Sequence, residues 1–425
     1  MSFPTGSFRG GVRPSTSLLY GVWSGQVWEV DTNGSVTLFS TLAGTDLVHI
    51  GRNNATVPQN AVVTDNGAFV IDTTAAAVSA YPDSDVGSPT CCCGYLGYFF
   101  FGYGNGTMQC SGYNTTDINT INQAQTVSNP DGLLNIKGYK GQIYAFGEQT
   151  VEVWGEPINA TGFPLTRVGF NITPGIACEH GVAGWEPEFG MAPIYVGSDN
   201  TVRMIQGYQA VVVSNSDVET DLQNLSFLQK SQIDTLCYIS GGNHFWQMNL
   251  AARSWVLHVE EGTWHERRSK DSTRSKLQRS IYFSNNWLVG DTDTAQVYKV
   301  VDDEPSEAGN TLTAIMESGP LKDFPRRQRV NRLDLDFTVG VGISTGSEPT
   351  QTDPQTQIEI SYDGGRNFSH SWDRKLGKDG KPLHRVFINN LGMTEDEGPR
   401  VRWTVSDQVH LGFQGGDIDT EVKTK

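Results

Sequence analysis

The sequence predicts an almost entirely β protein, with a β-propeller followed by a small β-sandwich-like domain. Charged residues make up only 18% of the chain, and glycine occupies 47 of 425 positions. Short apolar-alternating segments recur between turn residues at intervals of roughly 40 residues, which is the spacing of propeller blades. Long apolar heptads are absent, so the composition argues against a helix bundle.

The first blade is expected to begin at Leu18. Residues 18–30 alternate between apolar and polar positions and are interrupted at Ser24-Gly25. A turn at 31–35 then leads into a further apolar segment at 36–39. This pattern predicts a three-strand meander. Residues 1–17 are expected to form an N-terminal arm.

Further blades are expected along the chain as far as residue 301. The count suggests six or seven blades for a propeller over 18–301. The segments that carry the pattern after the first blade are 61–71, 94–110, 137–154, 192–213, 235–264 and 280–300.

One segment departs from the β pattern. Ser216 and Glu219 match a capping box, and Leu222, Leu225 and Leu228 would then lie on one helical face. The sequence therefore predicts one short helix near 216–230 that links two blades.

A polar run at 302–310, with Pro305 and Gly309, marks the end of the propeller. The strands expected beyond it are too few for a second propeller but sufficient for a small sandwich over 311–425. These strands are expected within 331–339, 357–362, 384–388 and 400–405.

The formal charge of −16 argues against an ordinary nucleic-acid binder, because DNA affinity comes mainly from Lys and Arg. An acidic surface suits a wall that DNA slides past, since like charges prevent sticking. The N-terminus has no signal-peptide pattern, and the aromatic run at 95–103 is too short to span a bilayer. We therefore expect a protein that remains in the cytosol, without stable membrane insertion.

The six cysteines do not indicate a disulfide framework. Cys91, Cys92 and Cys93 are adjacent, and Cys91 and Cys93 would share one face of a strand. Metal binding by that pair is an alternative, but no second Cys pair or Cys-x-x-Cys accompanies it, so buried, reduced thiols are predicted.

Two motifs that resemble catalytic signatures are rejected, and neither catalytic residues, metal ligands nor cofactors are predicted. Residues 342–346 match Gly-x-Ser-x-Gly, but a nucleophile elbow at Ser344 needs a helix directly after it, and 347–354 contains two prolines. His265 and Glu266 resemble the start of a zincin helix that lacks its second histidine.

Two aspartate pairs are also weighed as calcium sites. Asp291 with Asp293, and Asp417 with Asp419, each put two carboxylates on one face of an extended segment. Solvated turn aspartates are favoured, because neither pair has the glycine and distal glutamate of an EF-hand-like loop, but calcium is left open.

Ser361, Asp363, Gly365 and Phe368 match an Asp-box hairpin, in which a carboxylate closes its own turn and an aromatic side chain anchors it. A structural turn is expected here. Sialidases repeat this box in several blades, whereas this chain has it once and outside the propeller.

Two basic clusters stand out against the acidic background. Subunit contacts in a ring are favoured over contacts with DNA, because neighbouring ring surfaces must be complementary. The residues singled out are Arg267, Arg268 and Lys270 in the first cluster and Arg326, Arg327 and Arg329 in the second.

The order of motifs along the chain resembles the packaged-DNA stabilisation proteins of short-tailed phages, which are tail hub or nozzle proteins. The segments that carry the resemblance are 137–147, 151–154, 169–170, 179–181, 290–300, 332–337 and 361–368. The resemblance implies a structural virion protein, not an enzyme, assembled in the host cytoplasm into a ring of typically six subunits in the tail.

The same resemblance implies the partners of such a ring. It would attach below the portal and adaptor ring, extend the DNA channel, touch packaged double-stranded DNA transiently, and carry a tail needle, fibres or tailspikes. It would act in head completion and later open for DNA ejection. A carbohydrate-binding or glycan-degrading propeller, tailspike-like or sialidase-like, is the alternative and predicts exposed aromatics on one propeller face. A propeller that serves as a scaffold for protein partners is a third hypothesis.

Overall fold

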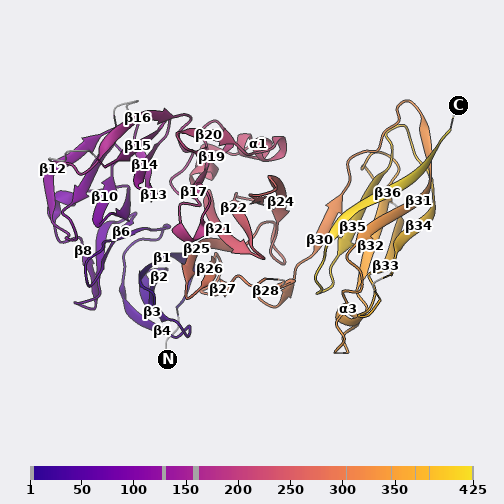
Figure 1. Cartoon of the computed structure of the whole chain (residues 1–425), viewed down its shortest axis with the longest axis horizontal. Helices are drawn as coiled ribbons and strands as arrows, with labels where there is room; N and C mark the ends of the chain where they lie inside the picture. The colour runs from indigo at the N-terminus through magenta and orange to yellow at the C-terminus, as the bar shows by residue number, and fades with distance from the viewer. Residues whose placement is uncertain are drawn as a thin grey trace. The chain divides into compact units, whose positions relative to one another are not determined.

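The computed structural model describes residues 4–126, 131–156, 162–302, 304–345, 347–368, 370–381 and 383–423. The chain divides into two compact units, Met1–Asp302 and Asp303–Lys425 (Figure 1). No helix in the described ranges is long and apolar enough to cross a membrane.

The first unit is a seven-bladed propeller, which confirms the predicted fold class. Within its described residues, six four-stranded antiparallel sheets and a final three-stranded sheet follow one another in chain order. The first strands of most neighbouring blades contact one another, side chains of blades 4 and 5 share a hydrophobic cluster, and β25 of the last blade contacts β1 of the first, so the ring is closed.

The blades have the following strands. Blade 1 has β1 (Phe8–Ser15), β2 (Leu18–Trp23), β3 (Gln26–Asp31) and β4 (Val36–Thr41). Blade 2 has β5 (His49–Arg52), β6 (Gln59–Thr64), β7 (Gly67–Asp72) and β8 (Ala77–Ala80), and blade 3 has β9 (Cys91–Tyr95), β10 (Tyr98–Gly102), β11 (Thr107–Ser111) and β12 (Ile118–Gln125). Blade 4 has β13 (Leu133–Tyr139), β14 (Gln142–Gly147), β15 (Val151–Gly155) and β16 (Thr166–Ile172).

Blade 5 has β17 (Val182–Ala183), β18 (Ile194–Val196), β19 (Val202–Gln206) and β20 (Gln209–Val212). Blade 6 has β21 (Asp234–Ser240), β22 (Asn243–Asn249), β23 (Ser254–His258) and β24 (Thr263–Arg267). Blade 7 has β25 (Leu277–Phe283), β26 (Asn286–Asp291) and β27 (Val297–Lys299).

The N-terminal arm expected at residues 1–17 is wrong where the structure describes it. Residues 8–15 form β1, the innermost strand of blade 1, which pairs with β2 from Phe8 opposite Trp23 to Ser15 opposite Leu18. The adjacent Gly10-Gly11 breaks the apolar alternation of this strand, which explains why the sequence pattern did not indicate it.

Tight turns set the register of several blades. Leu96-Gly97, Lys140-Gly141 and Ser284-Asn285 each join the first two strands of a blade, and all six of these residues have positive φ. Two-residue loops with positive φ at both positions are type I′ turns, whose twist matches that of the strands they connect.

Side chains, not a shared sheet, close the propeller between its first and last blades. Phe8 packs directly over Gly290, because a Cβ atom at that glycine would lie 2.4 Å from Cδ1 of Phe8. The indole of Trp23 donates to the Ala295 carbonyl at 3.1 Å, and Gln278 donates to the Phe8 carbonyl at 2.7 Å.

Two short helices replace the single predicted one. They are α1 (Ser216–Gln223) and α2 (Phe227–Ser231). The predicted capping box at Ser216 is wrong, because Asn215 is the N-cap of α1 and accepts from the Val218 amide, while Glu219 accepts from Ser214. A capping box is present one helix later, between Ser226 and Gln229 of α2.

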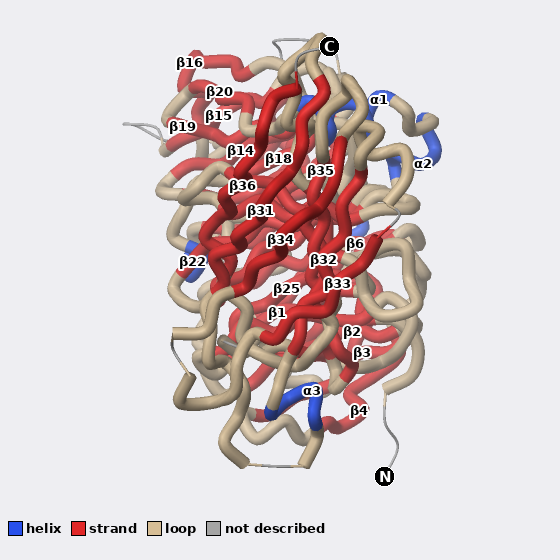
Figure 2. Tube along the Cα trace, turned by 90° about the vertical axis from the view of Figure 1, so that its right-hand side faces the viewer, coloured by secondary structure: helices blue, strands red, loops and turns tan. Residues whose placement is uncertain are grey.

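The second unit has two antiparallel sheets. One orders its strands β30 (Ala314–Glu317), β35 (Arg400–Val405), β32 (Gln355–Ser361) and β33 (His370–Lys375). The other orders them β34 (Val386–Met393), β31 (Arg327–Phe337) and β36 (Phe413–Lys423), with the long strands β31 and β36 side by side (Figure 2). Small elements complete it: β28 (Ser306–Glu307), β29 (Asn310–Thr311) and α3 (Pro349–Thr352).

One hydrophobic core joins the two sheets of the second unit. Leu333 and Leu335 of β31 pack with Ile358 and Ile360 of β32 and with Trp403 of β35. The unit begins at residue 303, earlier than the expected 311, because the short hairpin of β28 and β29 groups with it.

Candidate functional site

The Asp-box-like residues form a closed turn after β32. The Asp363 carboxylate accepts from the Ser361 hydroxyl at 2.8 Å, from the Asn367 amide at 2.9 Å and from the Asn367 side chain at 2.6 Å. These donors lower the pKa of Asp363 to about 2, with the Asn367 side chain as the largest cause. Gly365 has a φ of 100° and donates to the Ser361 hydroxyl.

The aromatic member of this turn faces a cation. The Arg402 guanidinium lies 3.6 Å from the centre of the Phe368 ring, and Arg402 also forms an ion pair with Glu359 at 3.1 Å. The Asp363 carboxylate thus binds donors of its own turn, which is the arrangement of a structural turn.

The basic residues predicted in the propeller do not form one patch. Arg267 donates to the Tyr238 hydroxyl at 3.4 Å, and Arg268 bonds Glu266 at 2.6 Å, while Lys270 is exposed in the loop that follows β24. Arg279, which belongs to the same run of sequence, turns inward and lies 3.4 Å from Asp234.

The basic residues predicted in the second unit are exposed but have acidic neighbours. Arg327 lies 2.5 Å from Glu395, and Arg326 lies 4.0 Å from Asp323. Arg329 of β31 is opposite Glu421 of β36. Positive charge on this surface is therefore largely compensated within the chain.

The structure brings together a group of polar residues that the sequence patterns did not indicate, at the axis of the propeller. His49 of β5, Lys137 of β13, His180 before β17 and Arg279 of β25 influence one another electrostatically, although they come from four different blades. His49 and Lys137 are buried, and so is Arg9 of β1. Buried side chains therefore fill the centre of the ring.

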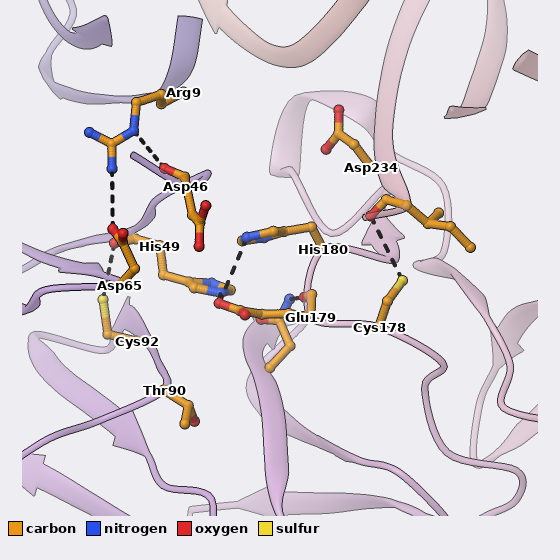
Figure 3. A network of polar contacts seen from close by, with 12 residues as sticks. Arg9, Asp46, His49, Asp65, Thr90, Cys92, Cys178, Glu179, His180 and Asp234 are labelled. Atoms are coloured by element: carbon orange, nitrogen blue, oxygen red, sulfur yellow. Dashed lines mark hydrogen bonds and ion pairs between the residues drawn. The ribbon is translucent and has the colours of Figure 1, made fainter. Parts of the chain in front are cut away.

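Arg9 ties the axis to the first two blades. Its Nε donates to the Asp46 carbonyl at 2.5 Å (Figure 3). Its Nη1 donates to the Ser24 carbonyl, also at 2.5 Å. Its Nη2 lies 4.0 Å from the Asp65 carboxylate. Because Arg9 is buried, it needs such partners, and the sequence patterns did not indicate it.

His49, Glu179 and His180 form the closest cluster at the axis. His49 Nε2 lies 2.7 Å from Glu179 Oε1, and His180 Nε2 lies 3.7 Å from the same oxygen. The two imidazole rings stack with centroids 4.7 Å apart. The side chain of His49 is 2% exposed, whereas that of Glu179 is 42% exposed.

Burial governs the charge of these imidazoles. Desolvation lowers the pKa of His49 to about 4, against the opposing effect of its hydrogen bond to Glu179. Desolvation and the nearby Arg279 lower the pKa of His180 well below its usual value. Both rings are therefore neutral at neutral pH.

The cysteines and the remaining sequence motifs have structural surroundings. All six cysteines are free and buried, as predicted, and burial raises the pKa of Cys91 to about 12. Asp291 accepts from the amides of Asp293 and Thr294 and from the Tyr298 hydroxyl, so it is a turn aspartate. Ser344 lies in a loop, and Gly346 of its motif lies outside the described residues.

Comparison with known proteins gives one family match. A family model of phage stabilisation proteins, described as "Bacteriophage P22 Gp10, beta-propeller", matches residues 3–304. No curated protein matches.

Solved propellers are similar to this chain at low sequence identity. The WD40 β-propeller domain of Doa1 is 10% identical with a TM-score of 0.45, and the match covers 70% of this chain and 94% of that one. PorZ, a component of the type-IX secretion system of Porphyromonas gingivalis, is 10% identical with a TM-score of 0.42, over 77% of this chain and 44% of that one.

Proposed function

Because this chain belongs to the phage DNA-stabilisation family of the bacteriophage P22 Gp10 β-propeller, we propose that it acts as a tail hub or nozzle. Several copies form a ring that extends the DNA channel below the portal and adaptor. The ring keeps packaged DNA inside the filled head and carries the tail needle or fibres. This proposal rests on the family match. The net charge of the chain and the packing of the propeller agree with it.

The charge of the chain suits a surface that DNA must pass without sticking. The chain has a formal charge of −16, and Arg268 and Arg327 lie against carboxylates of the same chain. Affinity for DNA grows with the number of phosphates that Lys and Arg neutralise. Cations that already have acidic partners gain little from replacing them with phosphates, so we expect weak and transient DNA contact.

The packing at the propeller axis supports a channel between subunits. Arg9, His49 and Lys137 are buried at the centre of a single propeller, so a duplex cannot pass through it. A channel wide enough for DNA therefore requires several copies arranged around a common axis, as closed cyclic symmetry provides. Contacts between neighbouring copies are where we place the exposed basic residues, including Lys270 and Arg329.

Phage particles made without this chain test the proposal. They should package DNA and then lose it, and adding the purified protein before DNA leaks should restore DNA retention. Nuclease-protected DNA per particle measures the effect, with particles made in the presence of the chain as the control. Stable, DNA-filled particles in the absence of the chain would contradict the proposal.

The purified protein provides a second test. Native mass spectrometry and cryo-EM, with and without the other tail components, should reveal a ring with a central opening. A monomer that never assembles on tail components but binds glycans on an array would favour the carbohydrate-binding alternative instead. No turnover of sialosides or other glycosides is expected in either state.

A further inference from the structure

Three potential metal ligands meet at the propeller axis from opposite sides of the ring. His49 begins β5 in blade 2, whereas Glu179 and His180 precede β17 in blade 5. One ligand atom from each residue lies within 4.8 Å of the other two. Figure 3 shows both imidazoles directed at the Glu179 carboxylate.

We propose that His49 Nε2, His180 Nε2 and the Glu179 carboxylate bind a divalent transition-metal ion, with Zn²⁺ as the preferred ion. Two imidazole nitrogens and one carboxylate oxygen are a common donor set for this ion. Ligand atoms around a tetrahedral Zn²⁺ lie about 3.4 Å apart, given metal–ligand distances of about 2.1 Å. The separations of 2.7 and 3.7 Å between the imidazole nitrogens and the carboxylate oxygen bracket that value, and all three ligand atoms lie within 4.8 Å of one another. Because the two rings are stacked, metal binding requires them to rotate until both Nε2 atoms face the ion.

The surroundings hold the ligands in place as an outer shell of a metal site does. The His180 imidazole lies close enough to the backbone of Leu47 to be influenced by it, while its Nε2 lies 3.7 Å from Glu179 Oε1. Asn135 donates to the Glu179 carbonyl at 2.6 Å, which anchors the backbone that carries two of the three ligands.

An orphaned acceptor next to the cluster is a second observation that indicates a ligand. Asn135 is 1% exposed, and its Oδ1 has no hydrogen-bond partner among the described residues. Burying an acceptor without a donor is unfavourable. A water molecule on the fourth position of the metal would supply the donor, because a three-ligand site keeps one position open.

Two neighbouring cationic side chains, Arg279 and Lys137, should weaken metal binding. Arg279 has Asp234 as its partner at 3.4 Å, and the Lys137 ammonium lies 4.6 Å from the centre of the Trp185 ring. Both nevertheless repel a divalent ion, so we expect micromolar affinity and not the tighter binding of an all-cysteine site. The partial exposure of Glu179 gives the ion a route to the cluster.

A metal here would join blades 2 and 5 across the axis. Because the ion binds the folded ring and not the unfolded chain, it stabilises the propeller by mass action. At a hundredfold excess over Kd we expect the unfolding midpoint to rise by about 5 °C.

Titration of the untagged, chelator-treated full chain with Co²⁺ tests the site directly. One equivalent should bind per chain and give the visible absorption of a four- or five-coordinate ion, and Zn²⁺ should displace it. The variants E179Q and H180N should weaken Co²⁺ binding at least tenfold. The control H244N/H258N removes two histidines beside Glu260 on the propeller surface and should bind Co²⁺ like the wild type.

Two results would overturn the proposal. The first is a folded wild-type chain that shows no Co²⁺ absorption and no shift of its unfolding midpoint at millimolar metal. The second is Co²⁺ binding that E179Q and H180N retain in full while H244N/H258N loses it. The wild-type measurement needs no variant, so the proposal can be tested even if H180N fails to fold.

Discussion

Phe8 occupies the space that a side chain at position 290 would need. A Cβ atom at Gly290 would lie 2.4 Å from Cδ1 of Phe8, and the Phe8 ring is 1% exposed and 5.0 Å from the ring of Trp23. This contact joins the first strand of the first blade to the second strand of the last blade. The closure of the ring therefore depends on the fit between these two residues.

Truncation of this aromatic residue should destabilise the whole propeller. F8A removes a buried ring at the closure and should lower the free energy of unfolding by about 3 to 5 kcal/mol. Urea denaturation followed by tryptophan fluorescence measures the change. F227A is the matched control, because Phe227 is 87% exposed, and its effect should stay within about 0.5 kcal/mol. Equal effects of the two substitutions would mean that Phe8 does not close the ring.

A methyl group at the closure should also be costly. G290A forces the Phe8 ring or the blade to move and should destabilise the propeller by about 1 to 3 kcal/mol. In F8A/G290A the methyl group enters the space that the ring has left, so the double variant should be more stable than the sum of the single effects predicts. Strict additivity in urea denaturation would argue against direct contact.

Acid should destabilise the metal-free propeller through His49. Burial lowers the pKa of His49 in the folded chain from 6.5 to about 4, so its contribution is complete above pH 6.5 and is lost as the pH falls to about 4. The loss is about 3 kcal/mol if His49 titrates alone, and His180 adds to it in the same direction. H49N should flatten the pH dependence of the unfolding free energy between pH 7 and 4 in the presence of a chelator. F227A, at an exposed and non-titrating position, should leave the dependence unchanged.

The Asp363 turn should matter for the second unit alone. D363A removes the acceptor of three hydrogen bonds and should lower the unfolding temperature of that unit. Because the pKa of Asp363 is lowered to about 2, the same stabilisation in the wild type should disappear only as the pH falls from 3.8 to about 2. D379A, at an exposed position outside this turn, is the control for calorimetry of the full chain. An unchanged unfolding transition in D363A would mean that the turn does not stabilise the second unit.

Reversing the charges of two basic residues in β31 should impair the assembly of subunits without unfolding the chain. R327E/R329E places like charges beside Glu395 and Glu421, but these residues are exposed, so the monomer should lose at most about 1 kcal/mol. If the basic residues of β31 contact a neighbouring subunit, the variant should assemble less well by native mass spectrometry and retain less DNA in particles. R268E/K270E tests the propeller surface in the same way. Normal assembly with lower DNA retention would instead assign these residues to the channel wall.

The fold was largely predictable because blades repeat a local pattern. Apolar alternation and turn residues marked a segment in each of the seven blades, although the predicted count was six or seven, and the Asp363 turn was recognisable from residues within one hairpin. The first strand was missed because the adjacent glycines at positions 10 and 11 interrupt its alternation. A helical segment near 216–230 was predicted correctly, but it contains two helices instead of one, and Asn215 caps the first of them instead of Ser216.

The axis could not be predicted, because its residues come together only when the ring closes. His49 and His180 are separated in sequence by three blades, and no local spacing relates them. The basic run at 267–279 was misleading for the converse reason. Its residues are close in sequence, but their side chains point in different directions. Arg279 reaches the axis while Lys270 is exposed on a loop.

The three-stranded last blade is the part of the propeller that a pulling force on the second unit reaches first. The chain leaves the ring directly after β27, so tension on the second unit enters the propeller at the outermost strand of blade 7, where three residue pairs join β27 to β26. We therefore expect these three pairs of a short hairpin strand to bear such tension before any other blade does. They belong to the blade that Phe8 and Trp23 hold to the start of the chain, so the part of the propeller that is loaded first is also the part that closes the ring.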